Sequence, residues 1–245
     1  MSASTTCTIC QTKLQGDYCS SCGQRYLGRR VNAWDVIGGW LSGLLLPERS
    51  LLGTFRQLLA NPRYIVNNYW SGFRGYYLSP SQLVVYMLFV FGLHLALVNQ
   101  EILGITVNVS GVSDSLKSFL SPQLFLFLLM IPMLGLSTAA VYYRHKHSFP
   151  EHFTAAIYLF ALWAILFTLL TDTLYLLLGM ELGSLPFWFF GAVFLWSARV
   201  FSPEGSAWYR VLLNAVLSIL MLALIFAILL GIAYLLDPEG AIEQG

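Results

Sequence analysis

The sequence predicts an all-α membrane protein that carries a small zinc ribbon at its N-terminus. Of 245 residues, 57% are hydrophobic and only 10% are charged, whereas about a quarter of a soluble domain is charged. Five apolar stretches follow residue 79, and four cysteines stand in two close pairs before residue 23. We therefore expect a ribbon with a basic linker over 1–30, an interfacial connector over 31–79, five transmembrane helices over 80–236 and an acidic outer tail over 237–245.

The four cysteines form the pattern C-x2-C-x8-C-x2-C, with Cys7 and Cys10 in the first pair and Cys19 and Cys22 in the second. Two pairs on tight turns can place four thiolates at the corners of a tetrahedron, which is the preferred site of structural zinc. Gly23 directly after the second pair lets that turn fold back. Iron in the same ligand set and redox work by one pair are the alternatives, and disulfides are disfavoured in a reducing cytoplasm. Since four protein ligands leave no open position, the zinc would be structural.

The connector is predicted to contain two helices that lie on the membrane or dock on the bundle. Residues 31–46 are too short and too rich in glycine for a confident span, and their tryptophans suit an interfacial or bundle-buried helix. Residues 48–60 form an amphipathic pattern with one leucine-rich face. Residues 61–80 then join the polar and the membrane parts, with Asn61 and Pro62 at a helix start and Gly72 as its stop. The aromatic and basic run 73–77 fits either a packed connector or a collar at the lipid headgroups.

Five apolar stretches have the length and composition of membrane helices or come close to it. The first, 80–99, begins with Ser79 and Gln82 placed as a capping box. The second, 122–143, contains Pro132 as a probable kink. The third, 150–178, is long enough to tilt or to project beyond the bilayer. The fourth, 185–200, is short, and the fifth covers 207–236.

The distribution of positive charge predicts the orientation. Residues 1–30 contain no apolar segment of the signal-peptide type, so the N-terminus is expected in the cytoplasm. With five spans, twelve of the thirteen lysines and arginines lie inside and only Lys117 lies outside, as the positive-inside rule requires. A re-entrant fourth stretch would move Arg199 and Arg210 outward and worsen this count. We therefore expect the C-terminus outside.

Two ionisable residues, His94 and Asp172, lie nearest the predicted membrane interior. Such groups are costly in lipid and often functional, and both fall in the outer half of the bundle, so a proton-coupled or substrate-binding pair is one hypothesis. A hydrogen-bonded core histidine and a water-exposed aspartate form the plainer interpretation. A cluster near the second inner loop admits either a second metal site or a solvated loop with a helix cap built on Ser148 and Glu151. Its members are His145, His147, Glu151 and His152.

Several cations lie at inner helix ends, where their ordinary role is to reach lipid phosphates. We expect anionic headgroups as their partners, and nucleic-acid binding beside the ribbon is unlikely. The candidates are Arg56, Arg63, Arg74, Arg144, Lys146, Arg199 and Arg210.

A series of residues in the N-terminal third carries a resemblance to a known family. They are Tyr18-Cys-x-x-Cys-Gly-Gln24, Glu48-Arg-Ser, Thr54, Leu58, Asn61-Pro62, Tyr69, Gly72-Phe-Arg74, Tyr77 and Pro80. With these residues the chain resembles a bacterial family known as domain of unknown function 3667, over about residues 7–85. It differs at Arg63, where glycine often follows the proline, and at Glu48, where aspartate is common. The resemblance implies a zinc ribbon, a connector and several spans in a bacterial inner membrane, and it supplies no activity.

The sequence holds no nucleophile elbow, phosphate loop, paired-carboxylate site or HExxH motif. We therefore expect a non-enzymatic adaptor or assembly factor whose ribbon docks a cytoplasmic partner. A transporter or lipid-handling protein is the alternative, and a membrane enzyme that acts on lipid is a third.

Overall fold

A computed structural model describes residues 6–32, 35, 51–97, 122–145, 147–180 and 185–236. Most of the predicted helix over 31–46, the outer loop and the acidic tail lie outside these residues. The described helices and strands follow one another as β1 (Arg25–Tyr26), α2 (Leu51–Ala60), α3 (Pro62–Trp70), β2 (Phe73–Arg74), α4 (Pro80–Leu97), α6 (Pro122–Val141), the short 3-10 helix Tyr143–His145, α7 (Phe149–Leu178), α8 (Leu185–Phe201) and α9 (Trp208–Leu236).

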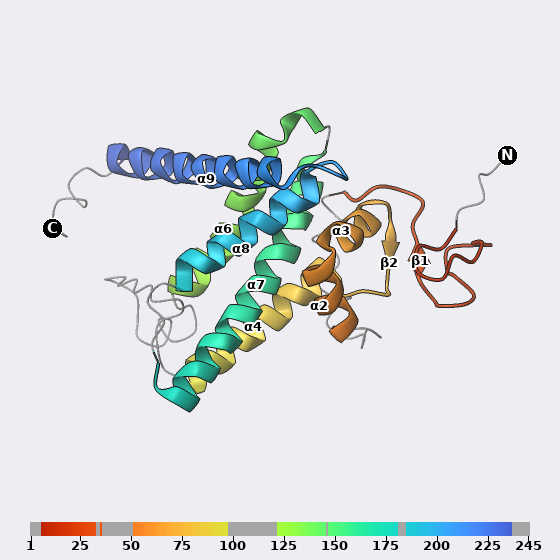
Figure 1. Cartoon of the computed structure of the whole chain (residues 1–245), viewed down its shortest axis with the longest axis horizontal. Helices are drawn as coiled ribbons and strands as arrows, with labels where there is room; N and C mark the ends of the chain where they lie inside the picture. Colours follow the sequence, from red (N-terminus) through yellow and green to blue (C-terminus); the bar gives the residue numbers. More distant parts are fainter. Residues whose placement is uncertain are drawn as a thin grey trace.

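Helix α7 is the centre of the bundle. It packs against α4, α6 and α8, and α4 and α7 lie side by side and run in the same direction (Figure 1). Its first half is almost fully buried, and Tyr158 donates a hydrogen bond of 2.8 Å to the carbonyl of Leu78 just before α4 begins. The apolar core of the described residues therefore follows α7 along its first half.

Helix α9 has a different environment. It contacts α6 and α8 and extends away from α4 and α7 at a clear slant (Figure 1). Its apolar window has a mean hydropathy of 2.8 and is only 11% buried, whereas the window of α7 has a mean hydropathy of 2.2 and is 67% buried. The more hydrophobic of the two helices is thus the one that the protein itself covers least.

Five apolar helices lie where the sequence predicts them, and a search of the described residues finds two of them long and apolar enough to cross a membrane. These are Phe149–Leu178 and Trp208–Leu229; in the described part of the chain the other three contribute the shorter stretches Pro80–His94, Leu129–Val141 and Trp188–Phe201. The positions of the five helices are therefore confirmed, whereas the prediction that all five are long enough to span a membrane is not. The helices themselves comprise 18 residues in α4, 20 in α6 and 17 in α8, and at 1.5 Å per residue a hydrocarbon core of about 30 Å needs about 20 residues.

The two predicted capping boxes are present. The amide of Ser79 donates to Gln82 Oε1 at 2.7 Å, and the amide of Gln82 donates to the Ser79 hydroxyl at 3.3 Å. The amide of Ser148 donates to Glu151 Oε2 at 3.0 Å. These bonds satisfy amides at the starts of α4 and α7 that have no partner within the helix.

The connector helices are docked on the bundle. Thr54 and Leu58 of α2 are buried, and the Trp196 indole N–H of α8 lies 3.2 Å from the carbonyls of both Leu58 and Leu59. Leu52, on the same predicted apolar face, is 81% exposed. The face is therefore shared between the protein interior and the surface.

A two-stranded sheet joins the ribbon to the connector. Strand β1 pairs antiparallel with β2, and the amide of Leu27 donates to the carbonyl of Gly72 at 3.0 Å. Gly72 has a φ of +91°, and a Cβ at this position would lie 2.6 Å from the backbone oxygen of Arg29. Only glycine fits here, because it tolerates the positive φ and leaves room for the passing chain.

Candidate metal centre and buried polar groups

The four cysteines converge at the N-terminal end of the molecule, on the far side of β1 from the helices (Figure 1). Their sulfur atoms all lie within 4.8 Å of one another. The Cys7–Cys22 sulfur pair is 3.5 Å apart, Cys10–Cys19 3.4 Å and Cys10–Cys22 3.7 Å. Four sulfurs bound at about 2.3 Å around a tetrahedral zinc ion would be about 3.8 Å apart, whereas a disulfide needs about 2.05 Å. The donor set therefore fits a metal ion with four thiolate ligands.

Two turns of the same construction hold the two cysteine pairs. The amide of Gln11 donates to the carbonyl of Cys7 at 3.0 Å, and the amide of Gly23 donates to the carbonyl of Cys19 at 2.9 Å. Both residues have a positive φ, 59° for Gln11 and 73° for Gly23. The predicted role of Gly23 is thus present, and Gln11 takes the equivalent position in the first turn, which its residue type did not reveal.

Groups next to the sulfurs favour the thiolate form of one ligand. Hydrogen bonding from the side chain and then the backbone of Thr12 lowers the pKa of Cys10 to about 6. Gln24 is only 2% exposed, and its Oε1 accepts hydrogen bonds from the Cys7 thiol at 3.0 Å and from the Thr8 hydroxyl at 3.1 Å. When Cys7 is a thiolate, the same amide can turn its N–H₂ group toward the sulfur.

The ribbon is fixed to the connector on one side. Besides the β1–β2 pairing, the hydroxyl of Tyr64 in α3 donates to the carbonyl of Thr8 at 2.7 Å, and the amide of Val31 donates to the carbonyl of Trp70 at 3.2 Å. Lys13 and Gln15 lie elsewhere on the ribbon and are exposed. The module therefore has one docked face and one open face.

The structure brings His94 and Asp172 together. His94 Nδ1 of α4 lies 2.6 Å from Asp172 Oδ1 of α7, with side chains 5% and 17% exposed. Because α4 and α7 run in the same direction, residues near the same end of each helix lie at the same level (Figure 1). Of the two interpretations that the sequence left open, the structure therefore agrees with a pair, and this pair is largely removed from solvent.

The inner-loop histidines do not form a second metal site in the part of the chain that is described. Four cysteines are the one group of three or more metal-ligating side chains found among the described residues. His152 Nδ1 contacts the Thr138 hydroxyl at 3.2 Å, and His147 lies 3.3 Å from the Glu151 carboxylate. The side chain of His145 lies outside the description.

Glu151 is the most buried carboxylate of this inner end, with 1% of its side chain exposed. Arg30 Nη2 lies 2.7 Å from one of its oxygens, so a residue of the ribbon linker neutralises the start of α7. The Trp70 indole N–H donates a hydrogen bond of 3.1 Å to the backbone carbonyl of Glu151. The helix-cap interpretation of this cluster is therefore confirmed, and the arginine partner was not predicted.

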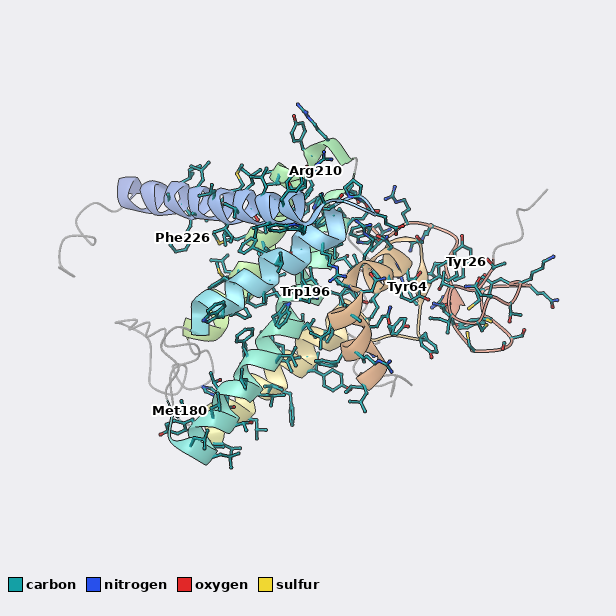
Figure 2. The ribbon with its side chains drawn as sticks, viewed as in Figure 1. Tyr26, Tyr64, Met180, Trp196, Arg210 and Phe226 are labelled. Carbon is teal, nitrogen blue, oxygen red and sulfur yellow. The ribbon has the colours of Figure 1, made fainter. Side chains whose placement is uncertain are left out.

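The predicted headgroup cations fall into two groups. Arg63 and Arg74 have internal partners: Arg63 donates to the Val200 carbonyl at 3.2 Å, and Arg74 lies 3.2 Å from Asp35. The others are exposed, except Lys146, which lies outside the described residues; Figure 2 shows the position of Arg210 and of other side chains. The exposed members are Arg56, Arg144, Arg199 and Arg210.

Sequence reasoning missed Asp35, which joins the ribbon linker to the connector. Arg29 forms two hydrogen bonds of 2.7 Å with its carboxylate, and Arg74 lies on the other side. Partial burial acts to raise the pKa of Asp35, but the bonds from Arg74 and Arg29 outweigh it and lower that pKa to about 2. The available signal was that Asp35 is one of two acids, with Glu48, among the arginines between residues 25 and 74.

Comparison with protein-family models, with curated proteins and with solved structures gives no match for this chain. The resemblance of residues 7–85 to the domain of unknown function 3667 therefore stays a prediction that rests on the residues quoted for it. The features of the molecule that bear on function are the metal centre, the buried polar groups and the exposed apolar helix α9.

Proposed function

We propose that this chain is a non-enzymatic adaptor or assembly factor of the bacterial inner membrane, with zinc in the cysteine site. The observation that carries this proposal is the ribbon, which is fixed to the helices on one side and open on the other. A four-thiolate site has no position for a substrate or a reactive water. A small rigid module of this kind suits the recognition of a cytoplasmic partner protein.

Membrane embedding is part of the same proposal. The supporting observation is α9, a highly apolar helix that the protein leaves almost uncovered. In water such a surface would be an aggregation site, whereas in a bilayer it would face lipid tails. We propose five spans with the N-terminus inside and the C-terminus outside, in which the three shorter helices cross by local thinning of the bilayer.

Anionic lipid headgroups are the proposed partners of the inner end. Tyr143 and Arg144 follow α6, and Trp208, Tyr209 and Arg210 begin α9, all of them exposed. Aromatic rings and cations together are typical of the headgroup level. Membership in the bacterial family of the domain of unknown function 3667 would agree with this architecture.

Site-specific photo-crosslinking in living cells tests the adaptor role. A crosslinker at Lys13, on the open face of the ribbon, should capture one defined cytoplasmic or membrane protein, and the additional change Gln15→Ala, at an exposed ribbon position, should weaken the capture. A crosslinker at Trp208, which is exposed at the start of α9, is the matched control. The proposal fails if Lys13 captures the same proteins as Trp208, or if the loss of zinc ligands leaves the capture unchanged.

A transporter or lipid-handling protein is the second candidate, and the buried pair His94–Asp172 favours it. Ionisable groups buried between proposed spans are costly and often take part in proton-coupled movement. Proton flux into proteoliposomes that contain the full chain, compared with Asp172→Asn, tests this candidate. Equal flux through both proteins and through empty liposomes would remove it.

A further inference from the structure

We propose that the cavity between the ribbon, the connector and the start of α4 binds an anion with phosphate-type oxygens, with Arg25 and Arg74 as its cationic contacts. The cavity has a volume of about 380 Å³ and is lined from the ribbon, α3, β2, α4 and α7. Such a volume is within the range of small-molecule sites. This site is separate from the adaptor role, because its walls include the docked face of the ribbon.

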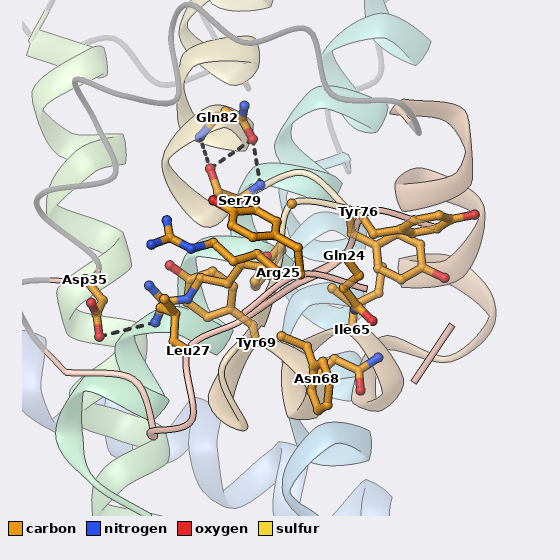
Figure 3. Close-up of a pocket in the computed structure, with 17 residues that line it drawn as sticks. Gln24, Arg25, Leu27, Asp35, Ile65, Asn68, Tyr69, Tyr76, Ser79 and Gln82 are labelled. Carbon is orange, nitrogen blue, oxygen red and sulfur yellow. Dashed lines mark hydrogen bonds and ion pairs between the residues drawn. The ribbon is translucent and has the colours of Figure 1, made fainter. Parts of the chain in front are cut away.

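The positive charge around the cavity exceeds the negative charge. Arg25 and Arg74 stand directly opposite each other in the β1–β2 pairing, and like charges at opposite positions destabilise a sheet. Asp35 is the one carboxylate among the described residues of the lining, and it is shared by Arg29, which bonds both of its oxygens, and Arg74, which lies 3.2 Å away. Figure 3 shows Asp35 at one side of the cavity and Arg25 next to it. An additional anion would offset the surplus charge.

Two donors in the lining have no acceptor within the described residues. They are Arg74 Nε and Asn68 Nδ2, both inaccessible to solvent as atoms, and the Asn68 side chain as a whole is only 9% exposed. A buried N–H group without an acceptor costs about 1 to 3 kcal/mol. A ligand with several oxygen acceptors would therefore remove a penalty that the chain alone leaves.

Tyrosine side chains form another wall. Tyr76 lies on the side of the cavity opposite Asp35, with Gln24 beside it (Figure 3). Tyr77 also lines the cavity, and its ring packs edge-on against Tyr76 with centroids 5.0 Å apart. Burial, together with the neighbouring Tyr64 and Tyr76, raises the pKa of Tyr77 to about 12, so its hydroxyl stays protonated and can donate. This wall supplies neutral donors and apolar surface, which suit the glycerol part of a headgroup as well as a phosphate.

The ligand class follows from these groups. Guanidinium groups bind phosphate oxygens with strong, charge-assisted hydrogen bonds. The cavity lies beside Ser79 and Gln82 at the start of α4, which is the inner headgroup level in the proposed topology. An anionic lipid and free phosphate share this chemistry, and only the lipid source rests on the proposed membrane embedding.

Native mass spectrometry of the full chain released from detergent micelles tests the site. One arm uses phosphatidylglycerol, a second uses phosphatidylcholine and a third uses inorganic phosphate. We expect selective retention of phosphatidylglycerol, with roughly tenfold weaker binding in Arg25→Gln, since one charge-assisted contact is lost. Lys13→Gln removes the same charge from an exposed ribbon position outside the cavity and should bind as the unchanged protein does.

Each outcome of this experiment either supports or overturns the proposed anion site. Selective loss in Arg25→Gln and recovery in Arg25→Lys support the lipid source. The same variant pattern with inorganic phosphate and no lipid preference supports free phosphate at this site. Equal binding by Arg25→Gln and Lys13→Gln in all arms overturns the proposal, and because Arg25 is exposed, this comparison does not depend on Arg74→Gln being able to fold. Crosslinking from Lys13 would be unaffected, so failure here is distinct from failure of the adaptor role.

Discussion

Single residues beside the four sulfurs decide how tightly the ribbon can hold a metal. Gln24 lies with its Oε1 3.0 Å from Cys7 Sγ and is almost fully buried. A neutral amide can present either an acceptor or a donor to the sulfur. A carboxylate at this position can only accept, and it would face a thiolate with like charge.

Gln24→Glu should therefore weaken zinc binding by about 10- to 100-fold, the usual range for groups that support a metal ligand. Competition with a chromophoric chelator measures the change. Gln15→Glu adds the same charge at an exposed ribbon position and serves as the control. Equal affinities for the two variants would show that Gln24 does not support the site.

Gly72 offers a second test at this scale, because its backbone conformation and its closeness to Arg29 can be separated. Gly75 also has a positive φ, of +80°, but nothing lies within 4 Å of its Cβ position, whereas at Gly72 the oxygen of Arg29 is 2.6 Å away. Gly75→Ala should cost about 1 kcal/mol for the backbone conformation alone. Gly72→Ala should cost about 2 to 4 kcal/mol, since the close contact adds to it.

Hydrogen exchange over residues 25–32 measures this difference. The amides of Leu27 and Val31, which donate to the carbonyls of Gly72 and Trp70, should lose protection in Gly72→Ala and keep it in Gly75→Ala. Protection that is the same in both variants would contradict the assigned role of the contact.

At the scale of helices, α4 and α7 are joined by the pair His94–Asp172. Removing one partner leaves the other in a site where an unpaired charge is costly. Asp172→Asn and His94→Gln should each destabilise the protein, and the double variant should lose less than the sum, with a coupling of about 0.5 to 3 kcal/mol. Denaturant unfolding in detergent gives the three values, and simple additivity would show that the contact contributes nothing.

The sequence predicts the positions of these helices far better than it predicts which side chains from other segments contact them. Composition places α4, α6, α7, α8 and α9 within a few residues, because a long apolar run has few alternatives in a chain of this kind. The capping residues Ser79 and Ser148 were also predictable, since their partners are three residues away. The link between Arg30 and Glu151 was not, because it depends on how the ribbon linker folds back over α7, and local pattern carries no information on that.

The same limit applies at the metal centre and the cavity. The spacing of four cysteines is enough to predict the ligand set, and Gly23 to predict one of the two turns. Gln11 has no residue-type signal for its positive φ. The opposition of Arg25 and Arg74 depends on the register of two strands that are 46 residues apart in the sequence, so no local pattern contains it.

At the scale of the whole molecule, the proposed membrane topology depends on the difference in burial between α7 and α9. The apolar window of α7 is 67% buried and that of α9 is 11% buried, so the apolar surface of α9 suits a lipid environment or a large partner. In the proposed topology the ribbon, the cavity and the exposed cations all lie at the inner face, and the outer ends of α4 and α7 carry the histidine–aspartate pair. Orientation is therefore the property on which the other roles depend.

Topology reporters fused after residues 110, 204 and 245 test this orientation most directly. A periplasmic reporter such as an exported phosphatase should be active after residues 110 and 245 and inactive after residue 204, and a cytoplasmic reporter should show the reverse. Such a result would establish an odd number of crossings between residues 110 and 204 and another odd number between residues 204 and 245, as the five-span account requires. A cytoplasmic C-terminus, or a reporter after residue 204 that is active outside, would contradict the five-span account.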